Sequence, residues 1–285
     1  MNILVIGGGG REHAISLCLQ KSPLIKKLVV APGNPGIAKF AECINIAIDD
    51  IEGQCNLAKK MKSDVVFIGP ELPLVLGLKD KLEEYGIKAF GPSKQAAQLE
   101  GSKSFARDFC LRHNIPQPKF KCCSNLKEAK KEIKKLNGYC VVKADGLAAG
   151  KGVIICENID DAINASRQIL EQKKFGKAGD RILIEERITG IEASLFAVSD
   201  GNNVTLIGSA QDHKRAFDNN KGPNTGGMGA LSPSPYVTEE LTNKIMKNII
   251  LPTIEGMKSE KMPYEGILYA GIMLTKDGPK VIEFN

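Results

Sequence analysis

Aromatic side chains are scarce in this 285-residue sequence. Tryptophan is absent, and phenylalanine and tyrosine together make up 5% of the residues. Proteins that bind single-stranded nucleic acid stack the bases on such side chains. The formal net charge is +6, but the lysines are spread along the chain, which is more typical of a solvated basic surface. We therefore expect no nucleic-acid partner, whereas the mild positive charge suits small phosphorylated ligands.

Long apolar runs and metal-binding patterns are also missing. No stretch reaches the roughly 18 apolar residues of a membrane span, and the apolar run directly after Met1 is typical of a strand and not of a signal peptide. The eight cysteines form no CxxC pair, and the three histidines form no HxxH or HExxH pattern, so a zinc site lacks its ligand spacing. We expect reduced thiols, no membrane association and a cytoplasmic protein.

Strand and helix patterns alternate over about the first 90 residues of the chain. Strands are expected at 2–6, 28–30, 64–68 and 88–90, with helices between them at 11–21, 54–62 and 74–85. Such alternation indicates parallel pairing and a doubly wound α/β sheet. Glycine or proline follows several of these strands, at the carboxyl ends where open α/β sheets bind ligands.

The pattern changes after residues 91–101, which gives expected domains at 1–101 and 102–285. Ser102 is expected to cap a helix that ends near His113. Further helices are expected at 125–136, 160–170 and 239–258. The intervening strands, of which the later ones are longer and mostly antiparallel, are expected at 119–122, 139–143, 153–156, 181–185, 192–198, 203–210, 266–275 and 280–284. This second half is therefore expected to be α+β.

Four glycines, Gly7–Gly10, lie between the first strand and the first helix. Such a turn exposes backbone N–H groups at the positive end of a helix, which favours phosphate, although it also serves as a merely tight turn. The dinucleotide fingerprint would need glycine at the position of Glu12, and the second strand ends without an acid to hold a ribose hydroxyl. A nicotinamide cofactor, and with it a dehydrogenase, is therefore the weakest hypothesis.

A second glycine-rich segment, KADGLAAGKGV, covers residues 143–153. It differs from a P-loop because its glycines are one residue too close and no serine or threonine follows Lys151. With expected strands on both sides, it is consistent with a flap whose N–H groups and lysine cover a triphosphate, or with a flexible hairpin. Lys143 ends a buried apolar run, where an ammonium group is costly without an anionic partner.

Acidic residues mark two further strand ends. Glu185, Glu186 and Glu192 could hydrogen-bond adenine and ribose, although acids at strand ends are more often simply solvated. Near the C-terminus, a period of two places Glu283 and Asn285 on one face of a strand, opposite the apolar side chains of the same segment. Two oxygen ligands on one face suit Mg²⁺, which completes its shell with phosphate and water.

Basic residues and glycines are concentrated at 209–215 and 221–230. Charge-dense loops of this kind are commonly just solvated. Their arginine, lysine and backbone donors also fit the stabilisation of charge on a transferred phosphoryl group.

Together these motifs resemble those of the ATP-grasp ligases, and more narrowly those of the phosphoribosylamine–glycine ligase (glycinamide ribonucleotide synthetase) family. The matching segments follow the family's order along nearly the whole chain: GGGGREHA at 7–14, APGNPG at 31–36, GPELPLV at 69–75, GPS at 91–93, QLEGSK at 98–103, KADGLAAGKGV at 143–153, EE at 185–186, SAQDHKR at 209–215, GPNTGGMGA at 222–230 and IEFN at 282–285. The resemblance implies a pre-ATP-grasp domain at 1–101 and an ATP-grasp domain at 102–285 with a mobile flap subdomain at about 120–188.

The resemblance implies ATP-dependent ligation of glycine to 5-phosphoribosylamine through glycyl phosphate, in purine biosynthesis. ATP and Mg²⁺ or Mn²⁺ would be the cofactors, the partners would be these small molecules alone, and the protein would be a monomer. Family members continue past Asn285 into a C-terminal domain, so the chain is expected to be a fragment or a shortened product whose ATP-grasp domain is incomplete. Another ATP-grasp carboxylate–amine ligase and a non-catalytic nucleotide-binding protein remain alternative hypotheses.

By resemblance, each proposed ligand has its own set of residues. The nucleotide set is Lys103, Lys143, Gly146, Gly150, Lys151, Gly152, Glu185, Glu186, Ile188 and Glu192. The metal ligands are Glu283 and Asn285. The phosphoribosylamine set is Gly9, Gly10, Arg11, Asn34, Gly69, Pro70 and Glu71. The acyl-phosphate centre is faced by the catalytic candidates Asp212, Lys214 and Arg215 and by the substrate loop Asn224, Thr225, Gly226 and Gly227.

Overall fold

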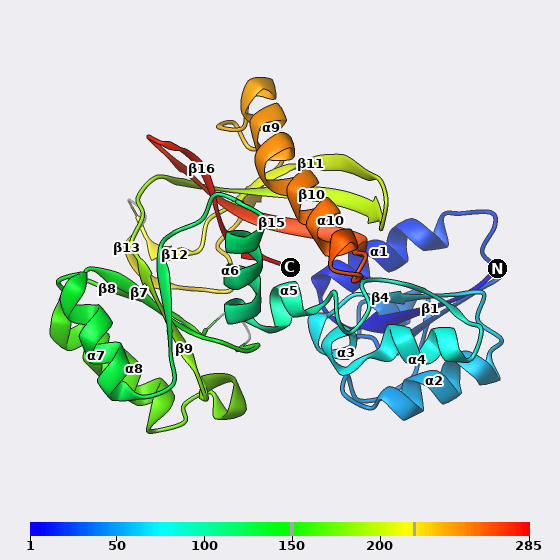
Figure 1. The fold of residues 1–285 in the computed structure, drawn as a ribbon. Coiled ribbons are helices and arrows are strands. Elements are labelled where there is room, and N and C mark those ends of the chain that lie inside the picture. Colours follow the sequence, from blue (N-terminus) through cyan, green and yellow to red (C-terminus); the bar gives the residue numbers. More distant parts are fainter. Residues whose placement is uncertain (149–150, 219–220) are drawn as a thin grey trace. The chain divides into compact units, whose positions relative to one another are not determined.

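The computed structural model describes residues 1–148, 151–218 and 221–285, and its elements are labelled in Figure 1. Contacts divide the chain into two compact units. Unit 1 contains Met1–Ala97 and Met262–Gly266, and unit 2 contains Gln98–Lys261 and Ile267–Asn285. Each unit has its own sheets and its own buried core. Among the described residues, no helix is both long enough and apolar enough to cross a membrane.

Unit 1 is built on a five-stranded sheet in the order β3-β2-β1-β4-β5, and its strand pairs are parallel. The strands are β1 (Asn2–Gly7), β2 (Lys27–Pro32), β3 (Glu42–Cys43), β4 (Val65–Ile68) and β5 (Lys88–Phe90). The chain order reverses between β1 and β4. The expected doubly wound parallel sheet is therefore confirmed, and β1 and β4 border the switch point at which such sheets bind ligands.

Both faces of this sheet are covered. Ile3 and Val5 of β1 belong to one core, while Leu4 and Ile6 belong to a second core on the other face, as strand alternation requires. The first core is covered by α1 (Gly10–Gln20) and η1 (Ile37–Lys39), and the second by α2 (Ile51–Lys60), α3 (Glu71–Leu76) and α4 (Leu78–Glu84). The helix expected at 74–85 is thus divided, because Gly77 has a φ of +93° and a left-handed residue ends a helix.

Unit 2 contains a four-stranded antiparallel sheet in the order β6-β9-β7-β8. Its strands are β6 (Phe120–Cys123), β7 (Cys140–Ala144), β8 (Val153–Cys156) and β9 (Ile182–Glu186). Helices α7 (Leu126–Lys135) and α8 (Ile159–Leu170) pack together on this sheet (Figure 1) and close a fully buried core. A short 3₁₀ turn, η2 (Gly176–Gly179), precedes β9.

The rest of unit 2 is a second sheet in the order β14-β11-β10-β15-β16, with a separate hairpin of β12 and β13. The strands are β10 (Ile191–Asp200), β11 (Val204–Asp212), β12 (Arg215–Phe217), β13 (Lys221–Asn224), β14 (Ala230–Leu231), β15 (Glu265–Thr275) and β16 (Gly278–Phe284). The helices are α5 (Gln98–Gly101), α6 (Lys103–Arg112), α9 (Glu239–Ile245) and α10 (Leu251–Ser259). A π-helical turn, η3 (Met246–Ile250), joins the last two, so the helix expected at 239–258 is one run with a widened turn.

Two local features of unit 2 position the site. The Ser102 hydroxyl accepts a hydrogen bond from the backbone N–H of Phe105, which confirms the expected cap of α6. On β16 the strict alternation expected near the C-terminus is interrupted. Gly271 of β15 lies opposite Glu283, and Ile272 lies opposite Val281, so Ile282 is one extra residue on β16. Such a bulge re-aims the side chains beside it.

Candidate functional site

Three charged side chains form a buried cluster in unit 2. Lys143 is the second-to-last residue of β7, and its Nζ lies 2.8 Å from Oε2 of Glu185 on β9. Arg107 of α6 donates two hydrogen bonds to the same carboxylate, Nε to Oε1 at 2.6 Å and Nη2 to Oε2 at 3.1 Å. Only 7% of Lys143 and 2% of Glu185 are exposed. The lysine that the sequence singled out as costly to bury therefore has its anionic partner.

These charges shift one another's pKa. Burial alone would raise the pKa of Glu185, but Arg107 and Lys143 outweigh it and lower that pKa to about 2. Burial lowers the pKa of Lys143, with Glu185 opposing this effect and Arg107 adding to it. With Lys143 protonated, the cluster carries two positive charges and one negative charge. A net positive charge in a buried cluster, shielded from water, is a suitable partner for phosphate.

Lys103 lies beside this cluster, at the start of α6. Its Nζ donates to the carbonyl of Gly146, 3.1 Å away, in the turn that follows β7. Burial lowers the pKa of Lys103, and the charge of Lys143 lowers it further. The structure thus brings together two of the three lysines of the predicted nucleotide set, Lys103 and Lys143, and each disfavours the other's charge until an anion lies between them.

Asp145 fastens the start of α6 to the same turn. Its carboxylate accepts hydrogen bonds from the backbone N–H of Ser104 at 2.7 Å and from the Ser104 hydroxyl at 2.9 Å. Nη2 of Arg181 lies 2.7 Å from Oδ2, the oxygen that also accepts from the Ser104 hydroxyl. Asp145 is 6% exposed, so these contacts replace the water that a buried carboxylate loses.

The remaining nucleotide candidates lie around the cluster. In the flap, the backbone N–H of Gly146 donates to Ala178, Lys151 is exposed and Gly152 is buried, while Gly150 lies outside the described residues. Glu186 accepts a hydrogen bond from the backbone N–H of Lys119 at 2.9 Å. Ile188 is half-buried and Glu192 is exposed.

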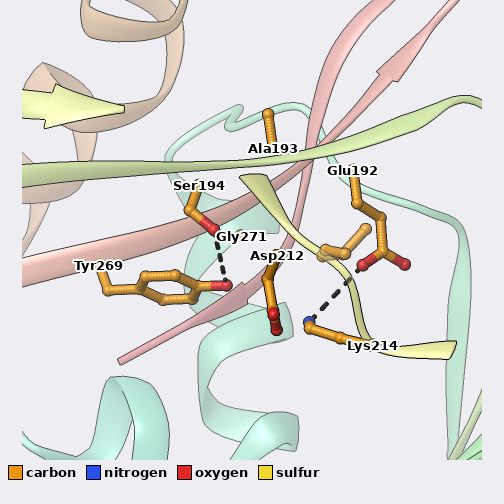
Figure 2. Close-up of a pocket in the computed structure, with 8 residues that line it drawn as sticks. Glu192, Ala193, Ser194, Asp212, Lys214, Tyr269 and Gly271 are labelled. Carbon is orange, nitrogen blue, oxygen red and sulfur yellow. Dashed lines mark hydrogen bonds and ion pairs between the residues drawn. The ribbon is translucent and has the colours of Figure 1, made fainter. Parts of the chain in front are cut away.

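A hollow lies beside the end of β16, and Figure 2 shows the side chains that line it. Nζ of Lys214 is 3.6 Å from a carboxylate oxygen of Glu192 and 3.6 Å from one of Glu283. The Ser194 hydroxyl is 3.3 Å from the phenol oxygen of Tyr269, which in turn donates to Oε1 of Glu283 at 3.3 Å. The hollow therefore presents one ammonium group among several oxygen atoms. Its complete lining is Glu192, Ala193, Ser194, Asp212, Lys214, Tyr269, Gly271 and Ile282.

Charges around this hollow keep Lys214 protonated. Burial would lower its pKa, but the carboxylates of Glu283, Glu192 and Asp212 together raise it well above the ordinary value. Burial and the nearby Glu283 raise the pKa of Tyr269 to about 12, so its phenol stays neutral and donates. A permanent cation beside acceptor oxygens can neutralise charge that develops on a phosphoryl group.

The loop after β13 folds back onto Lys214, which lies between β11 and β12. The backbone N–H and the hydroxyl of Thr225 both donate to the carbonyl of Lys214, at 2.6 and 2.9 Å, and the N–H of Gly227 donates to the Thr225 hydroxyl. Arg215 donates to the carbonyl of Gly222 at 2.6 Å and pairs with Asn224 in the hairpin. Gly226 is exposed, and a Cβ on Gly227 would lie 3.3 Å from Asp212. The catalytic candidates and the substrate loop therefore form one group.

Glu283 is the second-to-last residue of β16 and Asn285 directly follows this strand, where a metal was expected. The backbone groups of Asn285 exchange two hydrogen bonds with Tyr269, so the ladder continues to this residue. A carboxylate and an amide oxygen fit the preference of Mg²⁺ and Mn²⁺ for hard oxygen ligands. Within the described residues there is no cluster of three or more acidic, histidine or cysteine ligands. The donor set therefore suits a metal that takes most of its ligands from phosphate and water.

The predicted phosphate turn lies at the switch point of unit 1. The backbone N–H of Gly9 donates to the buried carboxylate of Glu12 at 2.7 Å, and Gly10 begins α1. Arg11 donates to the carbonyl of Gly69 and to a carboxylate oxygen of Glu71, the latter at 2.9 Å. The loops after β1 and β4 are thus joined by Arg11, and Pro70 precedes α3 as its N-cap residue.

Asn34 joins the loop after β2 to the same turn. Its side-chain amide donates to the carbonyl of Gly8 at 3.0 Å, while its oxygen accepts from the N–H groups of Gly36 and Ile37. A Cβ on Gly8 would lie 2.4 Å from the carbonyl oxygen of Gly33, and one on Gly69 would lie 2.2 Å from Glu12. The phosphoribosylamine candidates therefore form one close-packed group within unit 1, where only glycine permits the approach.

Comparison with known proteins identifies the family. The model of the phosphoribosylglycinamide synthetase N domain matches residues 1–100, and that of the ATP-grasp (A) domain matches residues 101–285. The chain belongs to the phosphoribosylglycinamide synthetase family. The resemblance inferred from the motifs is confirmed, and so is the ATP-grasp fold class.

Individual members of this family match the chain along its whole length. Phosphoribosylamine–glycine ligases of Brucella melitensis and Caldanaerobacter subterraneus are 48% and 45% identical to it over 285 residues, which is 100% of this chain and 66% and 68% of theirs. The solved phosphoribosylamine–glycine ligase of Thermotoga maritima is 29% identical with a TM-score of 0.85, covering 100% of this chain and 68% of that chain. The chain thus spans about two thirds of the length of these relatives.

More distant structures share the fold alone. An ADP complex of N5-carboxyaminoimidazole ribonucleotide synthetase is 18% identical with a TM-score of 0.76, covering 100% of this chain and 69% of that chain. Biotin carboxylase from Campylobacter jejuni is 20% identical with a TM-score of 0.79, covering 100% and 65%.

The motifs of the phosphoribosylglycinamide synthetase family do not reveal every residue at these sites. Arg107, Asp145, Ser194 and Tyr269 were not expected to take part. Arg107 is the one cation on the buried face of α6, which is a weak signal because such a face is normally apolar. Ser194 and Tyr269 carry no comparable signal, since ordinary strand patterns contain both residue types.

Proposed function

We propose that this chain catalyses the ATP-dependent ligation of glycine to 5-phosphoribosylamine, giving glycinamide ribonucleotide, ADP and phosphate. The observation that carries the proposal is the match to phosphoribosylamine–glycine ligases at 45–48% identity over the whole chain. The geometry supports it, since one unit holds a close-packed phosphate turn and the other holds buried lysines beside a hollow with a permanent cation. The expected setting is a cytoplasmic monomer with ATP and Mg²⁺ or Mn²⁺.

The reaction needs no covalent nucleophile from the protein. A carboxylate oxygen of glycine attacks the γ-phosphorus of ATP, ADP leaves, and glycyl phosphate forms. The amine of phosphoribosylamine then attacks the acyl carbon, phosphate leaves, and the amine loses one proton. Glu283 and Asn285 would hold the metal ion, which neutralises phosphate charge when it is bound.

Each group of side chains has a distinct part in this scheme. Lys143 and Lys103 would bind nucleotide phosphates from the buried cluster, whereas Glu185 holds Lys143 and leaves Glu186, Ile188 and Glu192 to flank the nucleoside. Lys214, with Asp212, Arg215 and the loop at 224–227, would face the acyl phosphate and balance its developing charge. The flap at 146–152 would exclude water, which would otherwise hydrolyse the acyl phosphate. Within unit 1, the turn at Gly9–Arg11, with Asn34 and the segment 69–71, would hold the phosphate of phosphoribosylamine.

The first experiment is to measure ADP release by this chain with Mg-ATP, glycine and freshly prepared phosphoribosylamine, omitting each component in turn. ADP that forms only in the complete mixture supports the ligase. ADP that forms with a different carboxylate or amine supports another ATP-grasp ligase. If nucleotide binds without turnover, a longer chain with the family's C-terminal segment is tested in the same way. The absence of ADP release by that longer chain would contradict the proposed reaction and favour a binding protein.

A further inference from the structure

Arg107 joins three separate elements of unit 2. It lies on α6 and is 4% exposed. Two of its hydrogen bonds go to Glu185 at the end of β9, and two go to backbone carbonyls of β16, Nη1 to Val281 at 3.1 Å and Nη2 to Ile282 at 2.7 Å. The partners are 78, 174 and 175 residues away in the sequence. A guanidinium group with these four bonds holds a fixed orientation in the core.

The two carbonyl contacts depend on the bulge in β16. Successive carbonyl groups of a regular strand point to opposite sides, so one side chain does not normally reach both. Ile282 is the extra residue of the bulge, and here the carbonyls of Val281 and Ile282 both point to Arg107. Arg107 thereby gives both of these carbonyls a hydrogen-bond partner. The next residue is Glu283, and the bulge sets the direction of its side chain.

The contacts with Glu185 set the charge beside the flap. Nζ of Lys143 lies 2.8 Å from the same Oε2 to which Arg107 donates, and it also donates to the Ile282 carbonyl at 3.0 Å. With Arg107 present, the three groups carry one net positive charge. Without it, Glu185 and Lys143 would cancel each other. A phosphate approaching Lys143 would then meet a neutral pair instead of a cation.

We propose that Arg107 is a positioning residue for nucleotide and metal binding in this chain. It neutralises Glu185, so that the charge of Lys143 remains available to a phosphate, and it holds the Ile282 bulge that directs Glu283. The proposal rests on the proposed function only in that the phosphate is that of a nucleotide. A residue that only stabilised the fold would not affect metal-free nucleotide binding through Lys143 and metal binding through Glu283 separately.

The test compares Arg107→Met, Arg107→Lys and the control Arg112→Met in this chain. Arg112 lies on the same helix and forms a similar two-bond pair with Glu260, at 2.8 Å for each bond, away from the cluster. The dissociation constant of ADP is measured by calorimetry without metal and again with Mn²⁺, and folding is checked by circular dichroism and urea unfolding. Both dissociation constants of ADP are equilibrium quantities, so they do not depend on turnover.

The variants differ in what they keep. Arg107→Met leaves Glu185 to cancel Lys143, and we expect metal-free ADP binding to weaken by about tenfold or more. Arg107→Lys keeps the positive charge but loses the planar set of N–H donors of the guanidinium group. We therefore expect its metal-free ADP binding to stay within about threefold of the unaltered chain. We also expect it to lose most of the ADP affinity that is gained with Mn²⁺. Arg112→Met is expected to bind ADP within about twofold of the unaltered chain.

A double variant separates charge from folding. In Arg107→Met with Glu185→Gln, both the cation and the acid it neutralises are gone, and the cluster again carries the single charge of Lys143. We expect this chain to bind metal-free ADP more tightly than Arg107→Met, by about fivefold or more. If Arg107→Met does not fold, the double variant and Arg107→Lys decide the question, since neither leaves an unpaired buried carboxylate.

The outcomes are distinct. The positioning role is wrong if Arg107→Met binds ADP as Arg112→Met does, if Arg107→Lys loses both affinities equally, or if the double variant binds metal-free ADP no better than Arg107→Met. Where Arg107→Met does not fold, the role is wrong if the double variant binds metal-free ADP about tenfold or more weakly than Arg107→Lys. If the unaltered chain binds no ADP at all, the proposed function fails and the positioning role fails with it. If the unaltered chain binds ADP and only the variants disagree, the proposed function stands and only the role of Arg107 is rejected.

Discussion

A single buried acid, Glu185, shows why the site needs its neighbours. A carboxylate taken out of water would normally be protonated, yet two cations hold the pKa of Glu185 at about 2. Removing one partner of such a group usually costs more than the pair contributes, because the remaining charge stays buried without compensation. Glu185 therefore affects both the stability of the folded chain and ligand binding. Measuring the free energy of unfolding at different pH values isolates its contribution to stability.

Glu185→Gln is expected to destabilise the chain at neutral pH and to matter less in acid. The folded-state pKa lies below the ordinary value of 4.5, so the stabilisation is present above pH 4.5 and is lost as the pH falls toward 2. At pH 7 the variant should lose on the order of 3 kcal/mol. At pH 3 the difference should be about 2 kcal/mol smaller. Urea unfolding at both pH values measures it, with the exposed Glu255→Gln as the control. A difference independent of pH would contradict the assigned charge.

Lys214→Met is expected to slow turnover without preventing nucleotide binding. Lys214 stays protonated among the oxygen atoms of the hollow, and under the proposed function its charge serves the phosphoryl group. Removing one preorganised charge of this kind lowers kcat by about 10²–10³-fold. ADP release under saturating substrates gives kcat, and calorimetry gives the ADP dissociation constant. The exposed Lys276→Met is the matched control, with kcat within about twofold. An equal loss of kcat and ADP affinity in Lys214→Met would place this lysine in the nucleotide site instead.

At the scale of elements, the sequence predicted most strands and helices because their patterns are local. The apolar run of β1, the cap at Ser102 and the parallel pairing in the first unit follow from residues that lie near one another in the sequence. The break at Gly77 and the bulge at Ile282 were missed. A glycine in a helical pattern has several possible causes, and a bulge is fixed by the partner strand and not by its own residues.

The same distinction applies to the candidate site. The candidate site residues could be named from the resemblance to the family, since the matching motifs are short segments of sequence. The contacts that hold these residues in place could not be predicted from the sequence. Arg107 reaches residues 78 and 174–175 positions away, and no periodicity in the sequence encodes a pairing over that distance. Burial of a charged side chain is visible only when its partners are known.

The turn after β1 offers an element-scale test through its glycines. We expect Gly8→Ala to destabilise the chain by about 1–3 kcal/mol, because its Cβ would lie 2.4 Å from the backbone oxygen of Gly33. Gly10→Ala should be neutral or stabilising by up to about 1 kcal/mol, since nothing lies within 4 Å of its Cβ and it is the first residue of α1. Urea unfolding of both variants makes the comparison. Equal effects would show that the turn is not close-packed.

At the scale of the whole molecule, the two units carry separate cores and separate phosphate candidates. Unit 1 packs around both faces of one parallel sheet, and unit 2 packs around two antiparallel ones. A ligand that stabilises the folded state raises protection in the part that it contacts. Binding of each ligand by its own unit is therefore expected to appear as protection confined to that unit.

Hydrogen–deuterium exchange of the whole chain tests this division. Mg-ADP is expected to slow exchange in α6, the end of β7, β9 and β16, while ribose 5-phosphate, which carries the phosphate of the second substrate, is expected to slow it at 8–11, 34–37 and 69–71. At a ligand concentration of 100 times the dissociation constant, amides that exchange only when the binding unit unfolds should gain about 2.7 kcal/mol of protection. Inorganic phosphate is the control for a nonspecific anion. If ribose 5-phosphate protects only the segments of unit 2, the turn at Gly9–Arg11 is not its site, and the assignment of the substrate phosphate to unit 1 is wrong.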